Sequence, residues 1–293
     1  MLKSIRPYLI LMRPANIVTA IADILAGISV AGLLFKGSAT EIAGLLLATI
    51  GLYGGGVVFN DVFDVELDKV ERPERPLPSG QVSVRQATVL GIVLLVLGIL
   101  AASTVSWESA ALALLVALLA LSYDKYAKHH GLLGPINMGL CRSFNLLLGV
   151  SISLLALKGY WYLGFIPLVF IGDITLTSQG EVKGDNISSL YLALALDLLV
   201  AGTFVLLYFY TDYELLSALP FLLLWFGLNV RAKLRAIQQN EPKMIMKAVK
   251  AGVLSLIPLN AAMAAGFEGW ISGLIVLALL PVSLGLARYF SVT

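Results

Sequence analysis

Three aspartates at the end of an apolar stretch are spaced so that they could bind one cation together. Asp61, Asp64 and Asp68 lie three and four positions apart. Because an α-helix advances about 100° per residue, a helix that continues through them would place the three carboxylates within an arc of about 60°. Asn60 falls just beyond this arc, whereas Glu66 points away from it. Carboxylate oxygens suit Mg²⁺, which keeps several waters and also takes phosphate oxygens from a substrate.

A stiff basic segment follows these acids. Arg72 and Arg75 lie among the three prolines of residues 71–78, and proline restricts its own backbone and that of the preceding residue. Such a segment can hold guanidinium groups over the acidic face, and guanidinium groups bind phosphate oxygens in a bidentate manner. The alternative is a solvated helix end whose acids pair with Lys69, Arg72 and Arg75. It explains the acids less well, because Glu66 lies off their face.

The composition indicates that these residues belong to a membrane protein. Of the 293 residues, 59% are hydrophobic and 13% are charged, whereas soluble domains are about 45–50% apolar and about 25% charged. The mean hydropathy is +0.90. These values exclude a disordered chain and a nucleic-acid-binding module, and they argue strongly against a soluble enzyme. The predicted fold class is all-α, a polytopic membrane protein with a single transmembrane domain over residues 1–293.

Apolar stretches recur between charged segments, and a membrane helix needs about 20 such residues. We therefore expect about nine to ten transmembrane helices. The predicted spans are residues 14–35, 41–63, 86–106, 108–124, 132–157, 160–178, 188–210, 214–235, 246–265 and 269–290.

The positive charges predict how the chain is oriented in the bilayer. Sixteen of the 20 lysines and arginines fall in the N-terminal segment, or in the connections after predicted spans two, four, six and eight and the span ends that border them. Cytoplasmic loops of membrane proteins carry the excess of these residues. We therefore expect a multi-pass protein whose N-terminus and acidic segments face the cytoplasm.

The acidic segment and the basic segment together resemble a known signature. The pattern Asn60-Asp61-x-x-Asp64-x-x-x-Asp68, followed by Arg72 and Arg75-Pro-Leu-Pro-Ser-Gly, is similar to the first motif of the UbiA superfamily of intramembrane prenyltransferases. Within that superfamily, residues 64–76 and 137–142 look most like the EboC-like subgroup.

The resemblance implies both a fold and an activity. The fold is an all-helical barrel, usually of nine helices, around a central cavity. The activity is Mg²⁺-dependent transfer of an isoprenoid chain from a prenyl diphosphate to an aromatic or other lipid-forming acceptor. By this resemblance the three aspartates are catalytic and bind Mg²⁺ with Asn60, while Arg72 and Arg75 bind the diphosphate.

A second acidic motif is expected after the sixth span. Aligned on Asp185, the family commonly has an aspartate where Ser178 stands, followed by acids at the positions of Glu181 and Asp185. The resemblance implies that Glu181 and Asp185 bind Mg²⁺ and that Lys183 binds diphosphate. Ser178 departs from the pattern, because a neutral hydroxyl replaces one anionic ligand. The alternative for this segment is an ordinary polar connection between helices.

Two further groups of residues are candidates for substrate binding. The family has a tyrosine followed four or five residues later by a base, which matches Tyr123 and Lys128 with a role in diphosphate binding. Lys128 could equally be one more cytoplasmic positive charge.

Asp23 and Arg142 lie inside apolar spans, where a charge costs several kcal/mol unless it is paired or faces a cavity. They could pair with each other, or Arg142 could bind an anionic acceptor group. Asn16 and Asn137 lie near the cytoplasmic ends of their spans and would line the same acceptor pocket.

Two other functions stay open on the sequence alone. Ser178 is compatible with a catalytically weakened homologue that binds or moves an isoprenoid lipid. The intramembrane charges are compatible with a secondary transporter. Against a transporter, the sequence has no obvious internal repeat, and its ionisable residues concentrate at one membrane face.

The charge pattern makes a topology prediction. Residues 64–85 and 231–250 carry ten of the 20 lysines and arginines, so both should face the cytoplasm. Cysteines introduced at exposed positions of these segments should react with a membrane-impermeant reagent only from the cytoplasmic side. Labelling of either segment from the opposite side would reverse the orientation.

Overall fold

The computed structural model describes residues 2–131, 133–179 and 187–290. Helices form the regular secondary structure of these residues, as the all-α prediction requires. In chain order they are α1 Leu2–Met12, α2 Pro14–Val30, α3 Ala39–Phe63, α4 Val65–Glu71, α5 Val84–Ser103, α6 Trp107–Lys125, η1 Ala127–His129, α7 Leu133–Val150, α8 Leu154–Tyr160, η2 Trp161–Gly164, α9 Phe165–Ser178, α10 Ile187–Tyr210, α11 Leu215–Gln239, α12 Pro242–Glu268, α13 Trp270–Leu277 and α14 Leu279–Ala287.

Length and hydropathy identify the helices that can cross a membrane. In the described part of the chain, eight segments qualify, or nine if the bent pair α1–α2 is one span. This agrees with the lower end of the predicted range of nine to ten. Helix α7 is not among them, and its 18 residues include Asn137, Arg142 and Asn145. These polar side chains reduce its hydropathy although it lies inside the bundle.

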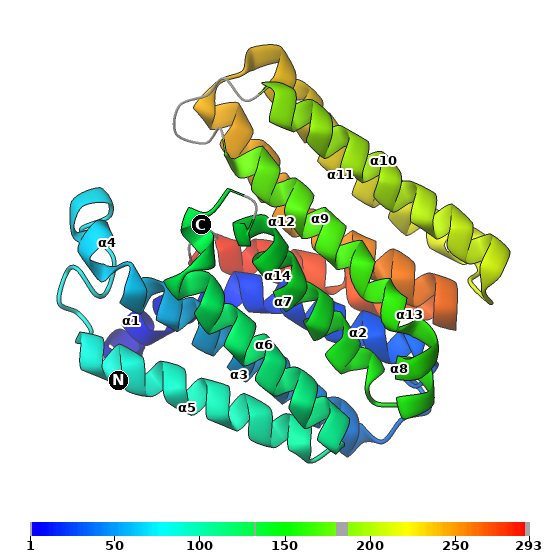
Figure 1. The fold of residues 1–293 in the computed structure, drawn as a ribbon, viewed down its shortest axis with the longest axis horizontal. Coiled ribbons are helices and arrows are strands. Elements are labelled where there is room, and N and C mark those ends of the chain that lie inside the picture. Colours follow the sequence, from blue (N-terminus) through cyan, green and yellow to red (C-terminus); the bar gives the residue numbers. More distant parts are fainter. Residues whose placement is uncertain (1, 132, 180–186, 291–293) are drawn as a thin grey trace.

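Helices α2 and α12 form the centre of the bundle. Nearly every residue of α2 is buried, and the two helices pack against each other. Helix α2 also contacts α3, α7 and α14, and α12 also contacts α9, α11 and α13. Helices α3, α5 and α6 lie on one side of this centre, and α9, α10 and α11 lie on the other (Figure 1). Side chains that point into the interior of the bundle therefore come from α2, α3, α7 and α12.

Two glycines allow α2 and α7 to approach closely. A Cβ atom at Gly27 would clash with the carbonyl oxygen of Leu146, and one at Gly149 would clash with that of Ile24. Small residues are the usual means by which membrane helices bring their backbones together. This contact fixes the facing side chains of the two helices, Asp23 among them, at short range.

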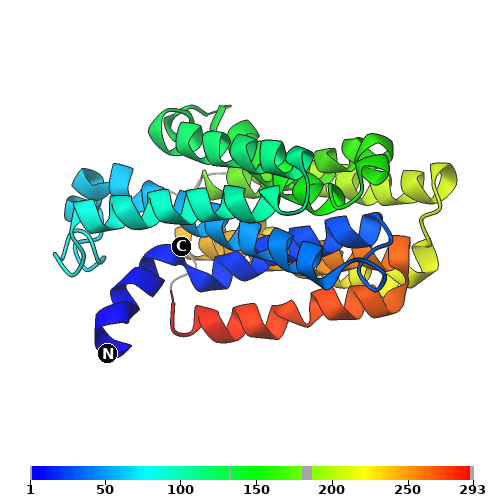
Figure 2. The ribbon, with the colours of Figure 1, turned by 90° about the horizontal axis from the view of Figure 1, so that it is seen from below.

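A bend between α1 and α2 redirects the N-terminal helix. The two helices are inclined by 47° at Arg13, whose backbone is left-handed with φ 48°, and Pro14 begins α2. Figure 2 shows α1 turning away from the bundle. The bend places Arg13 beside the end of α3, where the first acidic segment lies.

Two predicted boundaries are wrong. The fifth predicted span continued to residue 157, but α7 ends at Val150 and Ser153 caps the next helix by accepting the amide of Ala156 at 3.3 Å. The eighth predicted span ended at residue 235, but α11 continues to Gln239, and Asn240 adopts a left-handed φ of 42° that turns the chain directly into α12. The charged segment 231–250 is therefore mostly helical. The basic residues of this segment lie at the end of α11 and the start of α12, and not in a long loop.

A buried ion cluster connects α9, α10 and α11. The ammonium group of Lys233 donates to both oxygens of Asp173 at 2.6 and 2.5 Å and to Asp197 at 2.7 Å, and Asn229 donates to the other oxygen of Asp197. All four residues are at most 1% exposed. Lys233 was predicted to be a cytoplasmic loop charge, but it is the buried partner of two acids on neighbouring helices.

This cluster predicts how charge removal will affect stability. Lys233→Met should destabilise the protein by about 3–5 kcal/mol, because it leaves two buried carboxylates without a cation. Adding Asp173→Asn and Asp197→Asn should recover most of this loss. Thermal unfolding in detergent measures both effects, with Arg235→Met on the exposed face of α11 as the control. Equal unfolding midpoints for Lys233→Met and Arg235→Met would contradict the prediction.

Candidate active site

The first acidic segment lies at the junction of α3 and α4. The helix breaks at Asp64, whose φ and ψ are −92° and 3°. The Asp64 amide still donates to the Asn60 carbonyl at 3.0 Å, and the Asp68 amide donates to the Asp64 carbonyl at 2.8 Å. Helical hydrogen bonding therefore continues through the break, and the aspartates keep most of the predicted arrangement on one side.

Two of the three aspartates converge on the same arginine. Nη1 of Arg75 lies 3.3 Å from Oδ1 of Asp61 and 2.8 Å from Oδ2 of Asp68. Arg13 reaches the same Asp61 oxygen from the bend before α2, at 2.6 Å. Asp61 and Asp68 are each 4% exposed. The proline-containing segment thus holds Arg75, one of the two arginines predicted to lie there, against the acidic face.

The third aspartate has a different partner. Asp64 forms a short ion pair with Lys128, which follows the end of α6. The neighbouring Asn60 donates from Nδ2 to Oδ1 of Asp124 at 2.9 Å. Asp124 is 4% exposed, and its Oδ2 has no hydrogen-bond partner in the described residues. The end of α6 therefore supplies a fourth acid to the cluster, and η1 directly after it supplies a base.

The donor set suits a hard divalent cation. Four carboxylates, those of Asp61, Asp64, Asp68 and Asp124, lie among three cationic side chains, so negative charge is in excess. Within the described ranges, no three acidic, histidine or cysteine side chains are grouped closely enough to hold a metal alone. Mg²⁺ commonly binds through one or two carboxylates, completing its shell with water and substrate phosphates, and the residues present fit that mode.

The other predicted diphosphate and metal residues are placed as follows. Arg72 is exposed and forms no ion pair within the part of the chain that the structure describes. Tyr123 is half-buried on α6, within electrostatic range of Asp64 and Asp124. Ser178 is the last residue of α9, and its hydroxyl donates to the Thr175 carbonyl at 2.8 Å. The remaining predicted residues, Glu181, Lys183 and Asp185, lie outside the described residues.

The predicted acceptor residues are divided between two environments. Nη1 of Arg142 donates to Asp23 at 2.9 Å, so these two residues adopt the first of the two predicted alternatives and pair with each other. The guanidinium also lies 4.9 Å from the centre of the Tyr53 ring. Asn16 is buried near the start of α2, and Asn137 is half-buried on α7.

The Asp23 carboxylate is fully satisfied by partners from other helices. Besides Arg142, it accepts from Asn145 at 3.0 Å and from Asn260 at 2.7 Å. Asn145 in turn accepts from Thr49 at 2.8 Å. This network joins α2, α3, α7 and α12 inside the bundle, and it is neutral overall.

Sequence reasoning missed two residues of the cluster. Arg13 was counted only as a positive charge of the N-terminal segment, and Asp124 was given no role. Their partners lie 48 and 64 positions away in the sequence. A signal for Arg13 was available in the Arg13-Pro14 pair, because a residue before proline is restricted and often marks a bend.

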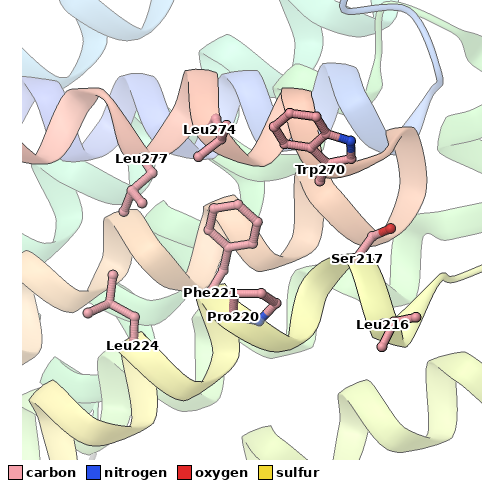
Figure 3. Close-up of a pocket in the computed structure, with 8 residues that line it drawn as sticks. All are labelled: Leu216, Ser217, Pro220, Phe221, Leu224, Trp270, Leu274 and Leu277. Carbon is pink, nitrogen blue, oxygen red and sulfur yellow. The ribbon is translucent and has the colours of Figure 1, made fainter.

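One apolar surface groove shares no residue with this cluster. A groove of about 660 Å³ runs between α11 and α13, with Phe221, Leu224, Trp270 and Leu274 among its walls (Figure 3). It is lined by no charged residue. It therefore cannot neutralise a diphosphate and is suited to apolar chains.

Sequence comparisons relate the chain to synthases of a membrane lipid. It is 31% identical over 188 residues to a digeranylgeranylglyceryl phosphate synthase of Sulfurisphaera tokodaii, covering 62% of this chain and 66% of that one. It is 37% identical over 181 residues to one of Ignicoccus hospitalis, covering 61% and 58%. The chain thus spans less than two thirds of the length of these relatives.

Solved structures share the fold at lower identity. A digeranylgeranylglyceryl phosphate synthase structure superposes with a TM-score of 0.70 at 21% identity, covering 91% of this chain and 99% of the other. A UbiA homologue from Archaeoglobus fulgidus bound to GPP and Mg²⁺ superposes with a TM-score of 0.65 at 14% identity, covering 93% and 99%. These matches extend the agreement in fold over nearly the whole chain.

The family assignment rests on the model that describes the UbiA prenyltransferase family, which matches residues 24–250. This range contains both predicted acidic segments and most of the helices around them. The more specific EboC-like assignment stays a prediction. With the acidic cluster at one end of an apolar helical bundle, the match establishes that this chain belongs to the UbiA prenyltransferase family.

Proposed function

We propose that the protein is a Mg²⁺-dependent intramembrane prenyltransferase that works at the cytoplasmic face. The proposal rests mainly on the ion-pair cluster at one end of the helical bundle. In this cluster Asp61 and Asp68 pair with Arg75, and Asp64 pairs with Lys128. Hard carboxylate oxygens and cationic side chains are what a metal-bound diphosphate requires. Family membership supplies the expectation that the diphosphate carries an isoprenoid chain.

The cationic side chains have two roles in this proposal. Without substrate, Arg13, Arg75 and Lys128 neutralise the aspartates. When Mg²⁺ occupies carboxylate oxygens, the same bases are available for the phosphate oxygens, with Arg72 and Tyr123 at the rim. Bound Mg²⁺ supplies charge neutralisation of the departing diphosphate. Hydrogen-bond donors and cations placed where negative charge develops in the transition state lower the activation barrier most.

The proposed reaction exchanges one bond for another. The bond between C1 of the prenyl chain and the diphosphate oxygen breaks with its electron pair leaving on the diphosphate. C1 then bonds to the nucleophilic atom of the acceptor, which loses a proton. The water-poor interior of the bundle disfavours hydrolysis of the activated chain.

The acceptor is proposed to be lipid-forming. The relatives from Sulfurisphaera tokodaii and Ignicoccus hospitalis are named for the synthesis of a glyceryl phosphate lipid. We therefore favour a prenylated glyceryl phosphate over an aromatic acceptor. The buried Asp23–Arg142 pair argues against free Arg142 as the group that binds the acceptor anion.

A second candidate function is motivated by Ser178. Its hydroxyl stands where the family commonly has an aspartate, and it bonds to the backbone of its own helix. A protein with one anionic ligand fewer could bind an isoprenoid diphosphate without efficient transfer. The two functions differ in whether diphosphate is released.

Diphosphate release tests the main proposal. The purified full chain, reconstituted in bilayer nanodiscs, should release inorganic diphosphate from geranyl or geranylgeranyl diphosphate when Mg²⁺ and geranylgeranylglyceryl phosphate are present. Chelation of Mg²⁺ should abolish release. An aromatic acid offered instead of the glyceryl phosphate distinguishes the acceptor classes. Binding without release would favour the weakened homologue.

Removal of one carboxylate tests the role of the first acidic segment. Asp64→Asn should reduce turnover by at least about 100-fold, on the scale that loss of one electrostatic stabiliser produces. Stability should change little, because Asp64 is half-buried in a polar setting. Glu66→Gln is the matched control, since Glu66 points to solvent and its ion-pair partner among the described residues is Lys69. Equal turnover in the two variants would favour the alternative interpretation, in which the aspartates belong to a solvated helix end.

A further inference from the structure

One buried carboxylate of the acidic cluster has no role of its own in the proposed function. Asp124, on the last turn of α6, is 4% exposed. Its Oδ1 accepts from Nδ2 of Asn60 at 2.9 Å, and its Oδ2 has no hydrogen-bond partner among the described residues. A buried carboxylate oxygen left without a donor is unfavourable by about 1–3 kcal/mol or more. Such an oxygen points to a donor that binds with the substrate.

The bond between these two residues determines the orientation of the Asn60 amide. Nδ2 of Asn60 donates to Oδ1 of Asp124, so the amide turns its NH₂ group toward Asp124. The carbonyl Oδ1 of Asn60 is therefore on the opposite side of the amide. It makes no hydrogen bond within the described ranges. An oxygen fixed in this way is a preorganised ligand for a hard cation.

The surroundings of Asp124 place it within the same charged cluster. Lys128, Asp64 and Arg13 all act on its carboxylate electrostatically. Asn60 directly precedes Asp61 and shares a helical turn with Asp64. A change in the orientation of the Asn60 side chain would therefore alter the first acidic segment, although the aspartates themselves stay the same.

We propose that Asp124 is a positioning residue of the Mg²⁺–diphosphate site. It holds the Asn60 amide so that Oδ1 is presented to the cation, and its own Oδ2 accepts a hydrogen bond from water in the cation's shell. This inference rests on the proposed function. Residues that orient metal ligands in this way typically contribute about 10–100-fold to metal affinity.

The first test removes the orienting acceptor. In Asp124→Asn, the new amide can donate to Asn60 as well as accept from it, so the Asn60 carbonyl is no longer held in one direction. The Mg²⁺ concentration for half-maximal binding of geranyl diphosphate should rise about 10-fold. The thermal unfolding midpoint without Mg²⁺ should stay close to that of the wild type. Glu108→Gln, at the opposite end of α6, is the matched control.

The second test exchanges the two residues. In Asn60→Asp with Asp124→Asn, the amide at position 124 donates to the carboxylate at position 60, whose second oxygen faces the cation. Adding Asn60→Asp should therefore restore Mg²⁺ affinity in the Asp124→Asn background. In the wild-type background it should give no such gain, because it sets two carboxylates within hydrogen-bonding distance.

The outcomes separate the two proposals. Normal Mg²⁺-dependent binding in the wild type, with an unchanged Mg²⁺ requirement in Asp124→Asn, would overturn the role of Asp124 alone. Purely additive effects of the two substitutions would also overturn it. Failure of the wild type to bind geranyl diphosphate in a Mg²⁺-dependent manner would overturn the proposed function and the role of Asp124 with it.

Discussion

Pairing of charges across helices is the constraint on which this bundle depends. A charge buried in an apolar bundle is tolerated when a partner satisfies it. Arg142 meets Asp23 between α7 and α2, and Lys233 meets two acids between α11, α9 and α10. Each pair fixes the rotation and depth of the helices that carry it, because removal of one partner would leave the other uncompensated. The apolar surface alone would allow these helices to slide.

The same physics acts differently at the acidic end of the bundle. The Asp23 network is closed, since each carboxylate oxygen has a donor from a neighbouring helix. The cluster around Asp61 is not closed, because one Asp124 oxygen has no partner in the described part of the chain and acids outnumber bases there. A closed network stabilises one arrangement, whereas an open network can exchange its internal partners for a ligand. This contrast separates the structural charges from those proposed to bind diphosphate.

Backbone geometry brings the parts of the open cluster together. The left-handed Arg13 turns the chain between α1 and α2, and the break at Asp64 keeps helical hydrogen bonds while ending α3. The proline-containing segment then returns Arg75 to the acids. These features are local, but each acts by presenting a side chain to a partner on another helix.

The sequence by itself determined the membrane character, the apolar helices and the spacing that puts Asp61, Asp64 and Asp68 on one side of a helix. These depend on composition and on the period of a single helix, which are local properties. Only the tertiary structure decided that Lys233 is buried, that Arg142 pairs with Asp23, and which bases meet the aspartates. Such contacts join residues far apart in the chain, and helical periodicity gives the face of a residue but not the helix packed against it.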